Sequence, residues 1–259
     1  MDYLKLEVKE RIAHLMLDRG TSNALNDKMV IELKKVLIEI ENDESIGGLI
    51  LYGKQGFFSS GLDLITLYDF DEKQMKDFWF EFLDLIKTFV AFRKPAIAAI
   101  GGHSPAGGCV LALCCDYRIM TEGEYIIGLN EVPVGIIVPD SIFDLYSFWL
   151  GRARAYRFLL EGTLLHPQRA LKVGLIDEMV LPNQLHTQAD KQMKKYINLN
   201  WKTWQLSKLN MRKELIAHFS QDPAEAIDMV LKQWWEPSTR SVVKTIIDNL
   251  KSKQPSKNE

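Results

Sequence analysis

The sequence predicts an α/β fold followed by a helical C-terminal region. Short apolar runs suited to buried strands alternate with amphipathic stretches suited to helices as far as about residue 138. Beyond that point nearly every stretch has helical periodicity. Because no Gly/Ser-rich or Pro-rich linker separates the two parts, we expect the helical part to pack on the α/β part or on a neighbouring subunit.

The N-terminal part is expected to begin with two strands and a helix. Apolar and charged residues alternate from Leu4 to Val8, and a turn at Glu10-Arg11 leads to a second strand that ends at Leu17. Asn26 offers a cap for the helix that follows. The apolar face of that helix comprises Met29, Val30, Leu33, Val36, Leu37 and Ile40.

The same patterns place the remaining elements. Strands are expected at 49–52, 96–100 and 117–120, and helices at 71–92 and 106–114. The C-terminal part is expected to form helices at 140–150, 152–161, 167–173, 182–197, 203–219, 223–235 and 238–251. The polar tail from Lys251 to Glu259 is expected to fray.

The composition argues against several classes of protein. Of the 259 residues, 47% are hydrophobic and 25% charged, which is typical of a globular chain. Since 32 basic residues face 34 acidic ones, we expect no nucleic-acid partner. The three cysteines lie within seven positions and lack metal-ligand spacing, which indicates buried reduced thiols.

The sequence shows no targeting or membrane segment. The N-terminus has no basic region followed by an apolar run, and no apolar stretch reaches the ~18 residues of a membrane helix. We therefore expect a cytoplasmic protein without a membrane span. The sequence is also compatible with an organelle-targeting peptide that has been cleaved.

Two turns rich in small residues follow neighbouring strands. One spans Phe57–Leu64 and the other Gly101–Cys109, each between a strand and a helix. A helix N-terminus presents unpaired N–H groups there, which suits a phosphate or a developing oxyanion. The alternative is that Gly107 and Gly108 only permit close helix packing, but two such turns together favour a site.

The second turn resembles a serine nucleophile elbow without matching it. Gly102-His103-Ser104-Pro105-Ala106 is close to G-x-S-x-G, so a serine hydrolase is a rival interpretation. In an elbow the residue after the serine donates its N–H to the oxyanion, and Pro105 has none. We therefore interpret Ser104 as a turn or cap residue.

Glu131 is the strongest candidate for acid–base chemistry. It is a lone acid in the apolar stretch from Tyr125 to Val138, where desolvation would raise its pKa toward the range of a general base. A helix cap or a salt bridge is the alternative for any glutamate. His103, His166 and Asp140 are weaker candidates.

Four segments together resemble the crotonase superfamily, the enoyl-CoA hydratase/isomerase family. They are Asn23–Asn26, Phe58–Leu64, Pro105–Cys109 and Ala170–Val180. Within the family, the strings S-P-A-G-G-C, C-D-Y-R-I and I-G-L-N-E make the chain most similar to mitochondrial-type Δ3,Δ2-enoyl-CoA isomerases.

The resemblance implies a spiral of ββα units over residues 1–198 and a helical oligomerisation region over 199–259 that assembles homotrimers or dimers of trimers. It implies that the backbone N–H groups of Leu62 and Gly107 form an oxyanion hole for a thioester carbonyl. The implied substrate-binding residues are Ala24, Leu25, Ser60, Gly61, Leu62, Asp63, Leu64 and Asn130.

The implied chemistry is the shift of a 3-enoyl-CoA double bond to the 2-trans position, as in fatty-acid oxidation. Hydratases of the family use two glutamates; here Val110 occupies the first position and Glu131 the second. The coenzyme A thioester is then the substrate, and no metal or cofactor is needed.

Two alternatives stay open. One is another acyl-CoA reaction of the family, such as hydration, decarboxylation or hydrolysis, and the other is a non-catalytic binding protein. Asp140-Ser141 replaces an aromatic pair of the isomerases, so acyl-chain preference is open.

Overall fold

A six-stranded sheet forms the centre of the fold in the computed structural model, which describes residues 1–252. The first two strands are antiparallel and every other neighbouring pair is parallel. In spatial order the strands are β1 (Leu4–Lys9), β2 (Ile12–Leu17), β3 (Gly48–Tyr52), β5 (Ala96–Ile100), β7 (Tyr117–Thr121) and β9 (Glu178–Val180). The predicted α/β class is confirmed.

A second, smaller sheet contains three short parallel strands. They are β4 (Gly56–Phe57), β6 (Gly102–Pro105) and β8 (Ile127–Gly128). Each follows a strand of the larger sheet in the chain, so strand pairs and helices repeat in the ββα order of the expected spiral. The sequence predicted none of these strands and placed turns over much of β4 and β6, because strands of two to four residues are too short to show periodicity.

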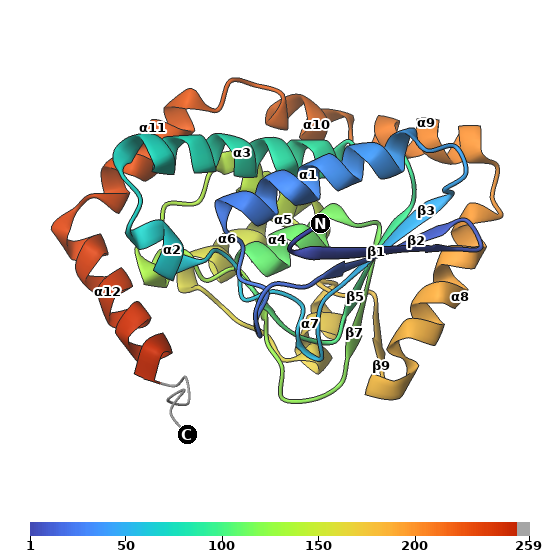
Figure 1. Ribbon diagram of the computed structural model, residues 1–259, viewed down its shortest axis with the longest axis horizontal. Coiled ribbons are helices and arrows are strands. Elements are labelled where there is room, and N and C mark those ends of the chain that lie inside the picture. The colour runs from blue at the N-terminus through green and yellow to red at the C-terminus, as the bar shows by residue number, and fades with distance from the viewer. Residues whose placement is uncertain (253–259) are drawn as a thin grey trace.

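Helices cover both faces of the large sheet (Figure 1). On one face α1 (Asp27–Asn42) and α3 (Glu72–Val90) lie side by side. On the other face α8 (Leu185–Ile197) packs against β3, β5 and β7, where Met193 contacts the apolar layer containing Ile50. Apolar side chains therefore point to both faces of β3, as expected for a buried parallel strand.

The beginning of α1 confirms the predicted cap. The side chain of Asn26 accepts a hydrogen bond from the Met29 N–H at 3.0 Å, which satisfies one of the free N–H groups of the first turn. The buried residues of α1 are the six predicted: Met29, Val30, Leu33, Val36, Leu37 and Ile40.

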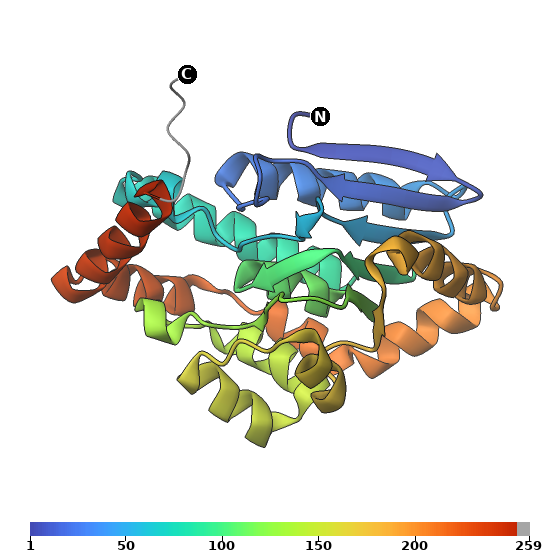
Figure 2. The same cartoon turned by 90° about the horizontal axis from the view of Figure 1, so that it is seen from below.

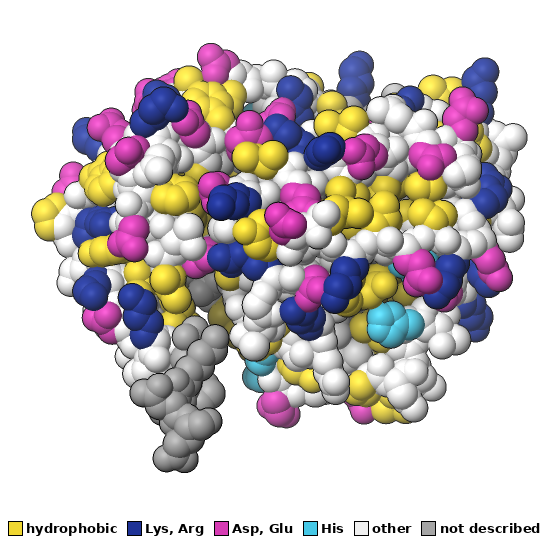
Figure 3. Space-filling model, in the orientation of Figure 1, with side chains coloured by type: hydrophobic (Ala, Val, Ile, Leu, Met, Phe, Trp, Pro, Cys, Tyr) yellow, Lys and Arg dark blue, Asp and Glu magenta, His cyan; other side chains and the backbone are white. Residues whose placement is uncertain are grey.

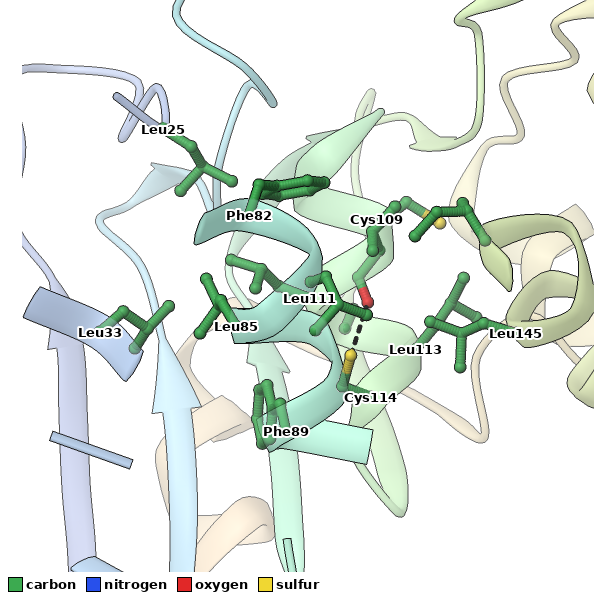
Figure 4. Packing of buried hydrophobic residues seen from close by; sticks show 14 of the residues in the cluster. Leu25, Leu33, Phe82, Leu85, Phe89, Cys109, Leu111, Leu113, Cys114 and Leu145 are labelled. Atoms are coloured by element: carbon green, nitrogen blue, oxygen red, sulfur yellow. Dashed lines mark hydrogen bonds between the residues drawn. The ribbon is translucent and has the colours of Figure 1, made fainter. Parts of the chain in front are cut away.

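The helix α4 (Gly107–Cys114) lies at the centre of the core and is buried on all sides. Figure 4 shows Leu111 and Leu113 packed among side chains of α3 and α5, including Phe82 and Leu145. Each such side chain contributes about 1.5–3 kcal/mol by leaving water. The predicted buried thiols are confirmed: Cys109, Cys114 and Cys115 are free and buried.

The C-terminal half is helical, as predicted. After the 3₁₀ turn η1 (Val132–Val134) the helices are α5 (Asp140–Leu150), α6 (Arg152–Glu161), α7 (Pro167–Val173), α9 (Trp201–Met211), α10 (Lys213–Phe219), α11 (Ala224–Trp234) and α12 (Pro237–Ser252). A second 3₁₀ turn, η2 (Pro182–Gln184), precedes α8. Of the tail expected to fray, Lys251 and Ser252 end α12 and residues 253–259 lie outside the described residues.

The single helix predicted at 203–219 is two helices, so that prediction was wrong. The interruption falls at Arg212, whose buried guanidinium donates to the carbonyls of Val90 and Cys114 and pairs with Asp116. These contacts fix the chain to the end of α4 at that residue. Sequence periodicity does not reveal such an anchor.

The last helices pack on the same core as the α/β part. α10 and α11 run along α3, and α12 packs on the short helix α2 (Leu64–Tyr68). Figures 1 and 2 show α12 at the end of the molecule opposite α8. Phe219, Ile227 and Trp234 belong to the main hydrophobic cluster, so the division at 198/199 stays a prediction.

The surface in Figure 3 carries interspersed acidic and basic side chains, in keeping with a net charge of −2. Over residues 1–252, no helix combines the length and apolar character needed to cross a lipid bilayer.

Candidate active site

The turn after β4 contacts the N-terminus of α4. A Cβ added to Gly61 would lie 2.9 Å from the Ala106 Cβ, and a Cβ added to Gly108 would lie 2.4 Å from the Ser59 carbonyl oxygen. Gly61 also has a φ of +88°, a conformation that L side chains rarely adopt. Both glycines are therefore needed to bring the two predicted turns together.

Two backbone N–H groups are left unpaired where the turns meet. Leu62 precedes the first turn of α2, and Gly107 is the first residue of α4. In the described part of the chain, neither N–H donates a hydrogen bond to another backbone group. Two such donors beside a helix N-terminus can stabilise one oxygen atom that carries negative charge.

The peptide of Leu62 is held in place by its neighbours. The Leu25 N–H donates to the Gly61 carbonyl at 2.8 Å, and the Asp63 N–H donates to the Leu25 carbonyl at 2.9 Å. The Asp63 carboxylate caps α2 through Thr66 and pairs with Arg19 at 2.6 Å. This rigid loop fixes the direction of the Leu62 N–H.

Glu131 directly precedes the 3₁₀ turn η1 after β8, and its carboxyl group is desolvated. The residue as a whole is partly buried, but its Oε2 atom is inaccessible to solvent and has no hydrogen-bond partner within residues 1–252. Burial raises the pKa of the Glu131 carboxyl from 4.5 to about 7, an effect that backbone N–H groups of Asn130 and Glu131 offset only in part. Such a carboxyl can both accept and return a proton at neutral pH.

A cavity of about 560 Å³ brings these groups together. Leu62, Gly107 and Glu131 all line it. So does Val110, one turn after Gly107 on α4, where it is almost fully buried. Among the residues that the structure describes, the cavity thus contains the two unpaired donors and a single carboxylate that is not already engaged, since Asp63 is occupied by Arg19 and Thr66.

Most of the substrate-binding residues implied by the resemblance lie on this cavity. Those on its wall are Ala24, Ser60, Leu62, Asp63, Leu64 and Asn130. Leu25 and Gly61 are absent from the wall and support it from behind through the hydrogen bonds given above.

Several wall residues were missed by sequence reasoning. They are Trp79 and Phe82 of α3, Ile142 of α5, and Ile246 and Leu250 of α12. They come from helices far apart in the chain, and their only sequence signal is membership of an apolar helix face. They give one side of the cavity its apolar character.

The weaker candidates lie elsewhere. His103 packs between Phe57 and Tyr125, and His166 contacts the Tyr125 carbonyl; neither lines the cavity. Asp140 faces a neighbouring cavity, so it is not placed as a second acid.

The interpretation of Ser104 as a turn or cap residue was wrong. Ser104 lies in β6, is fully buried and does not line the cavity, and α4 has no side-chain cap. A short strand carries it inward instead. Its burial, together with the following Pro105, also argues against a serine nucleophile.

The site places two unpaired backbone donors and one carboxyl of raised pKa on the same cavity, an arrangement suited to enzymes that stabilise an oxyanion. Comparisons with known proteins identify the family. The family model for enoyl-CoA hydratase/isomerase matches residues 7–237. The chain therefore belongs to the enoyl-CoA hydratase/isomerase family.

The similar proteins include some named as isomerases and some named as hydratases. The chain is 39% identical over 204 residues to mitochondrial enoyl-CoA delta isomerase 1 of Mus musculus, covering 78% of this chain and 71% of the relative. It is 30% identical over 208 residues to a probable mitochondrial enoyl-CoA hydratase of Dictyostelium discoideum, covering 78% and 72%. The crystal structure of human mitochondrial delta3-delta2-enoyl-CoA isomerase superposes with a TM-score of 0.94 at 28% identity, covering 97% of this chain and 99% of that one.

Proposed function

We propose that this protein is a Δ3,Δ2-enoyl-CoA isomerase that converts 3-enoyl-CoA to 2-trans-enoyl-CoA. The observation that carries the proposal is that the described wall of the cavity has one unengaged carboxylate, Glu131. Val110 stands at the position where hydratases have their other glutamate. Valine can neither hold a water molecule nor transfer a proton. The mouse and human proteins named as isomerases support the same choice.

In the proposed reaction Glu131 removes a proton from C2 of the 3-enoyl thioester. The electrons move onto the thioester oxygen and form a dienolate, which the N–H groups of Leu62 and Gly107 stabilise. The same carboxyl then returns the proton to C4, which leaves the double bond between C2 and C3. With a pKa of about 7, Glu131 is partly deprotonated at neutral pH and can take both roles.

The walls of the cavity suit the two ends of such a substrate. Ala24, Ser60 and Leu64 lie near the loop that carries the Leu62 donor, and we propose that the coenzyme A portion lies along them. The acyl chain would contact the apolar side formed by Trp79 and Phe82. The proposed chemistry requires no metal and no redox cofactor. One carboxyl takes and returns the proton, and the two backbone N–H groups stabilise the charge on the thioester oxygen.

We also propose assembly into homotrimers or dimers of trimers through the C-terminal region. Leu206 and Met211 of α9 and Met229 of α11 are more than half exposed, and contact with another subunit would remove this apolar surface from water. Light scattering coupled to size exclusion measures the number of subunits.

The cytoplasmic location stays a prediction. The rodent relatives are mitochondrial by name, and cell fractionation separates the two compartments.

The decisive assay follows the ultraviolet absorbance of the conjugated product as 3-enoyl-CoA is consumed. Glu131→Gln keeps the side-chain shape and removes the base, so kcat should fall by about 10²–10⁴-fold. Glu122→Gln replaces an exposed acid nine positions earlier in the chain, just after β7, and is the matched control. Isomerisation that persists at the wild-type rate in Glu131→Gln would refute the assigned role.

A further inference from the structure

A second cavity adjoins the catalytic one and shares a wall with it. It has a volume of about 620 Å³ and lies between α3, the α10–α11 connection and the first turn of α5. Ile137, Val138 and Pro139 line both cavities. These three residues, the partition, therefore separate the two spaces.

The middle of the partition is held by side-chain packing and not by backbone hydrogen bonds. Across residues 1–252, no backbone hydrogen bond involves the N–H or the carbonyl of Ile137 or Val138. Backbone hydrogen bonds occur only at the ends, where the Ile136 N–H donates to the Glu131 carbonyl at 3.0 Å and the Pro139 carbonyl accepts from Ile142 at 3.0 Å. Between the ends, the partly buried side chains of Ile137 and Val138 pack against the main hydrophobic cluster. Displacing Ile137 and Val138 would therefore break apolar packing but no backbone hydrogen bond, and segments with few backbone hydrogen bonds are among those that open locally.

One side-chain contact fastens the partition from outside. Asp140 follows it directly, and its Oδ2 lies 3.2 Å from Nε2 of His218 on α10. The other ring nitrogen of His218 lies 2.8 Å from Asp144 Oδ2, and Asp144 is held by Arg152 at 2.9 Å. His218 thus joins α10 to the first turn of α5, immediately beside the partition.

The second cavity is lined by both apolar and charged residues. Its apolar residues beyond the partition are Phe80 and Leu83 of α3, Phe219 of α10, and Ala226 and Met229 of α11. Its acidic residues include Glu81, Asp84 and Glu225. An uncharged hydrocarbon chain matches the apolar residues. Although Lys87 lies on the same wall and Lys34 pairs with Glu81 and Asp84, the acidic residues outnumber the lysine of the wall and disfavour the phosphates of coenzyme A.

We propose that the partition sets the acyl-chain length this site accepts, and that the second cavity receives the distal methylene groups of long-chain acyl thioesters when the partition moves aside. The His218–Asp140 contact favours the closed arrangement, which retains short chains in the catalytic cavity. The proposal rests on the proposed function, because it assigns the substrate class of that same site. It gives Asp140 the role of a positioning residue.

The test compares kcat/KM for six-carbon and sixteen-carbon 3-enoyl-CoA. Asp140→Asn removes the charge that faces His218, while an amide oxygen can still accept from the Ser141 N–H, as Asp140 Oδ1 does at 2.8 Å. His218→Ala removes the other partner. Because the contact is partly solvent-exposed, the ratio of long-chain to short-chain kcat/KM should rise about two- to fivefold in either variant.

Two further variants make the test specific. Lys76→Met is the control. It breaks the 2.9 Å Lys76–Asp228 ion pair, which joins two other helices beside the second cavity, α3 and α11, but lines neither cavity, so the ratio should stay unchanged. Ala226→Phe fills the second cavity, so adding it to His218→Ala should return the ratio to the wild-type value. An unchanged ratio in both Asp140→Asn and His218→Ala, or a gain that survives Ala226→Phe, would overturn the proposal.

Failure of the proposed function gives a different result. In that case the wild-type protein isomerises neither substrate. Calorimetric binding of saturated hexanoyl-CoA and palmitoyl-CoA to the same variants then measures the chain-length ratio without catalysis, with the same expected increase and the same refuting outcomes.

Discussion

Replacing Glu131 by Gln should stabilise the folded protein at alkaline pH while it removes the proposed activity. The buried Oε2 of Glu131 lacks a hydrogen-bond partner among the described residues, so the charged carboxylate loses solvation on folding, and the backbone N–H groups of Asn130 and Glu131 compensate only in part. A neutral amide of the same shape avoids this cost. The free energy of unfolding therefore reports the desolvation of Glu131 without any substrate.

The magnitude follows from the two pKa values of the carboxyl. Its pKa is 4.5 in its ordinary state and about 7 in the folded protein. The folded state therefore binds more protons than the unfolded state between these values, and stability falls as pH rises through that window. Between pH 5 and pH 8 the charged form of Glu131 should cost about 2.5 kcal/mol of unfolding free energy.

Urea unfolding of both proteins at pH 5 and pH 8, at one protein concentration, measures this cost. The stability difference between Glu131→Gln and wild type should grow in favour of the variant by about 2.5 kcal/mol from the lower to the higher pH. Taking the difference at two pH values cancels any pH-independent effect of the amide. The exposed Glu122→Gln variant should show no such growth.

A flat difference would refute the reasoning. If Glu131→Gln gains no stability relative to wild type on going from pH 5 to pH 8, the carboxyl is solvated in the folded protein. The raised pKa and the argument for a neutral-pH base would then both fail.

Three further predictions concern the same cavity. The kcat/KM for 3-enoyl-CoA should rise with pH and level off above about 7, because the reaction begins with deprotonated Glu131; a rate that falls through this range contradicts the assignment. Val110→Glu should add measurable hydration of 2-enoyl-CoA, detected as 3-hydroxyacyl-CoA by chromatography, and no product would argue against our explanation for the absence of hydration. Gly108→Ala should cost about 1–3 kcal/mol and most activity, because its Cβ would meet the Ser59 carbonyl at 2.4 Å. Gly101→Ala, with its nearest contact at an ordinary 3.4 Å, should be tolerated in the same unfolding and activity assays.

The sequence by itself determined the strands and helices that have strong local patterns. The apolar face of α1 and its Asn26 cap follow from spacing alone, because a helix of this length repeats its burial pattern several times. The short strands β4, β6 and β8 carry no such repeat. The local sequence around Ser104 therefore predicts a turn, although pairing of β6 with β4 and β8 buries this residue in a strand.

The candidate site divides in the same way. Glu131 stood out from the sequence because an acid in an apolar stretch is unusual, and the two small-residue turns stood out because each follows a strand. The resemblance added the donors Leu62 and Gly107. Local patterns and motifs were sufficient for these groups because each lies in a short continuous segment.

Only the tertiary structure decided what surrounds those groups. The apolar wall of Trp79, Ile142 and Ile246 is assembled from three helices separated along the chain, and no local pattern shows which helix faces will meet. The structure also turned Asp140 away from the catalytic cavity and toward His218. Burial and orientation depend on packing between distant segments, so the desolvation of Glu131 and the partition beside it are properties of the folded chain.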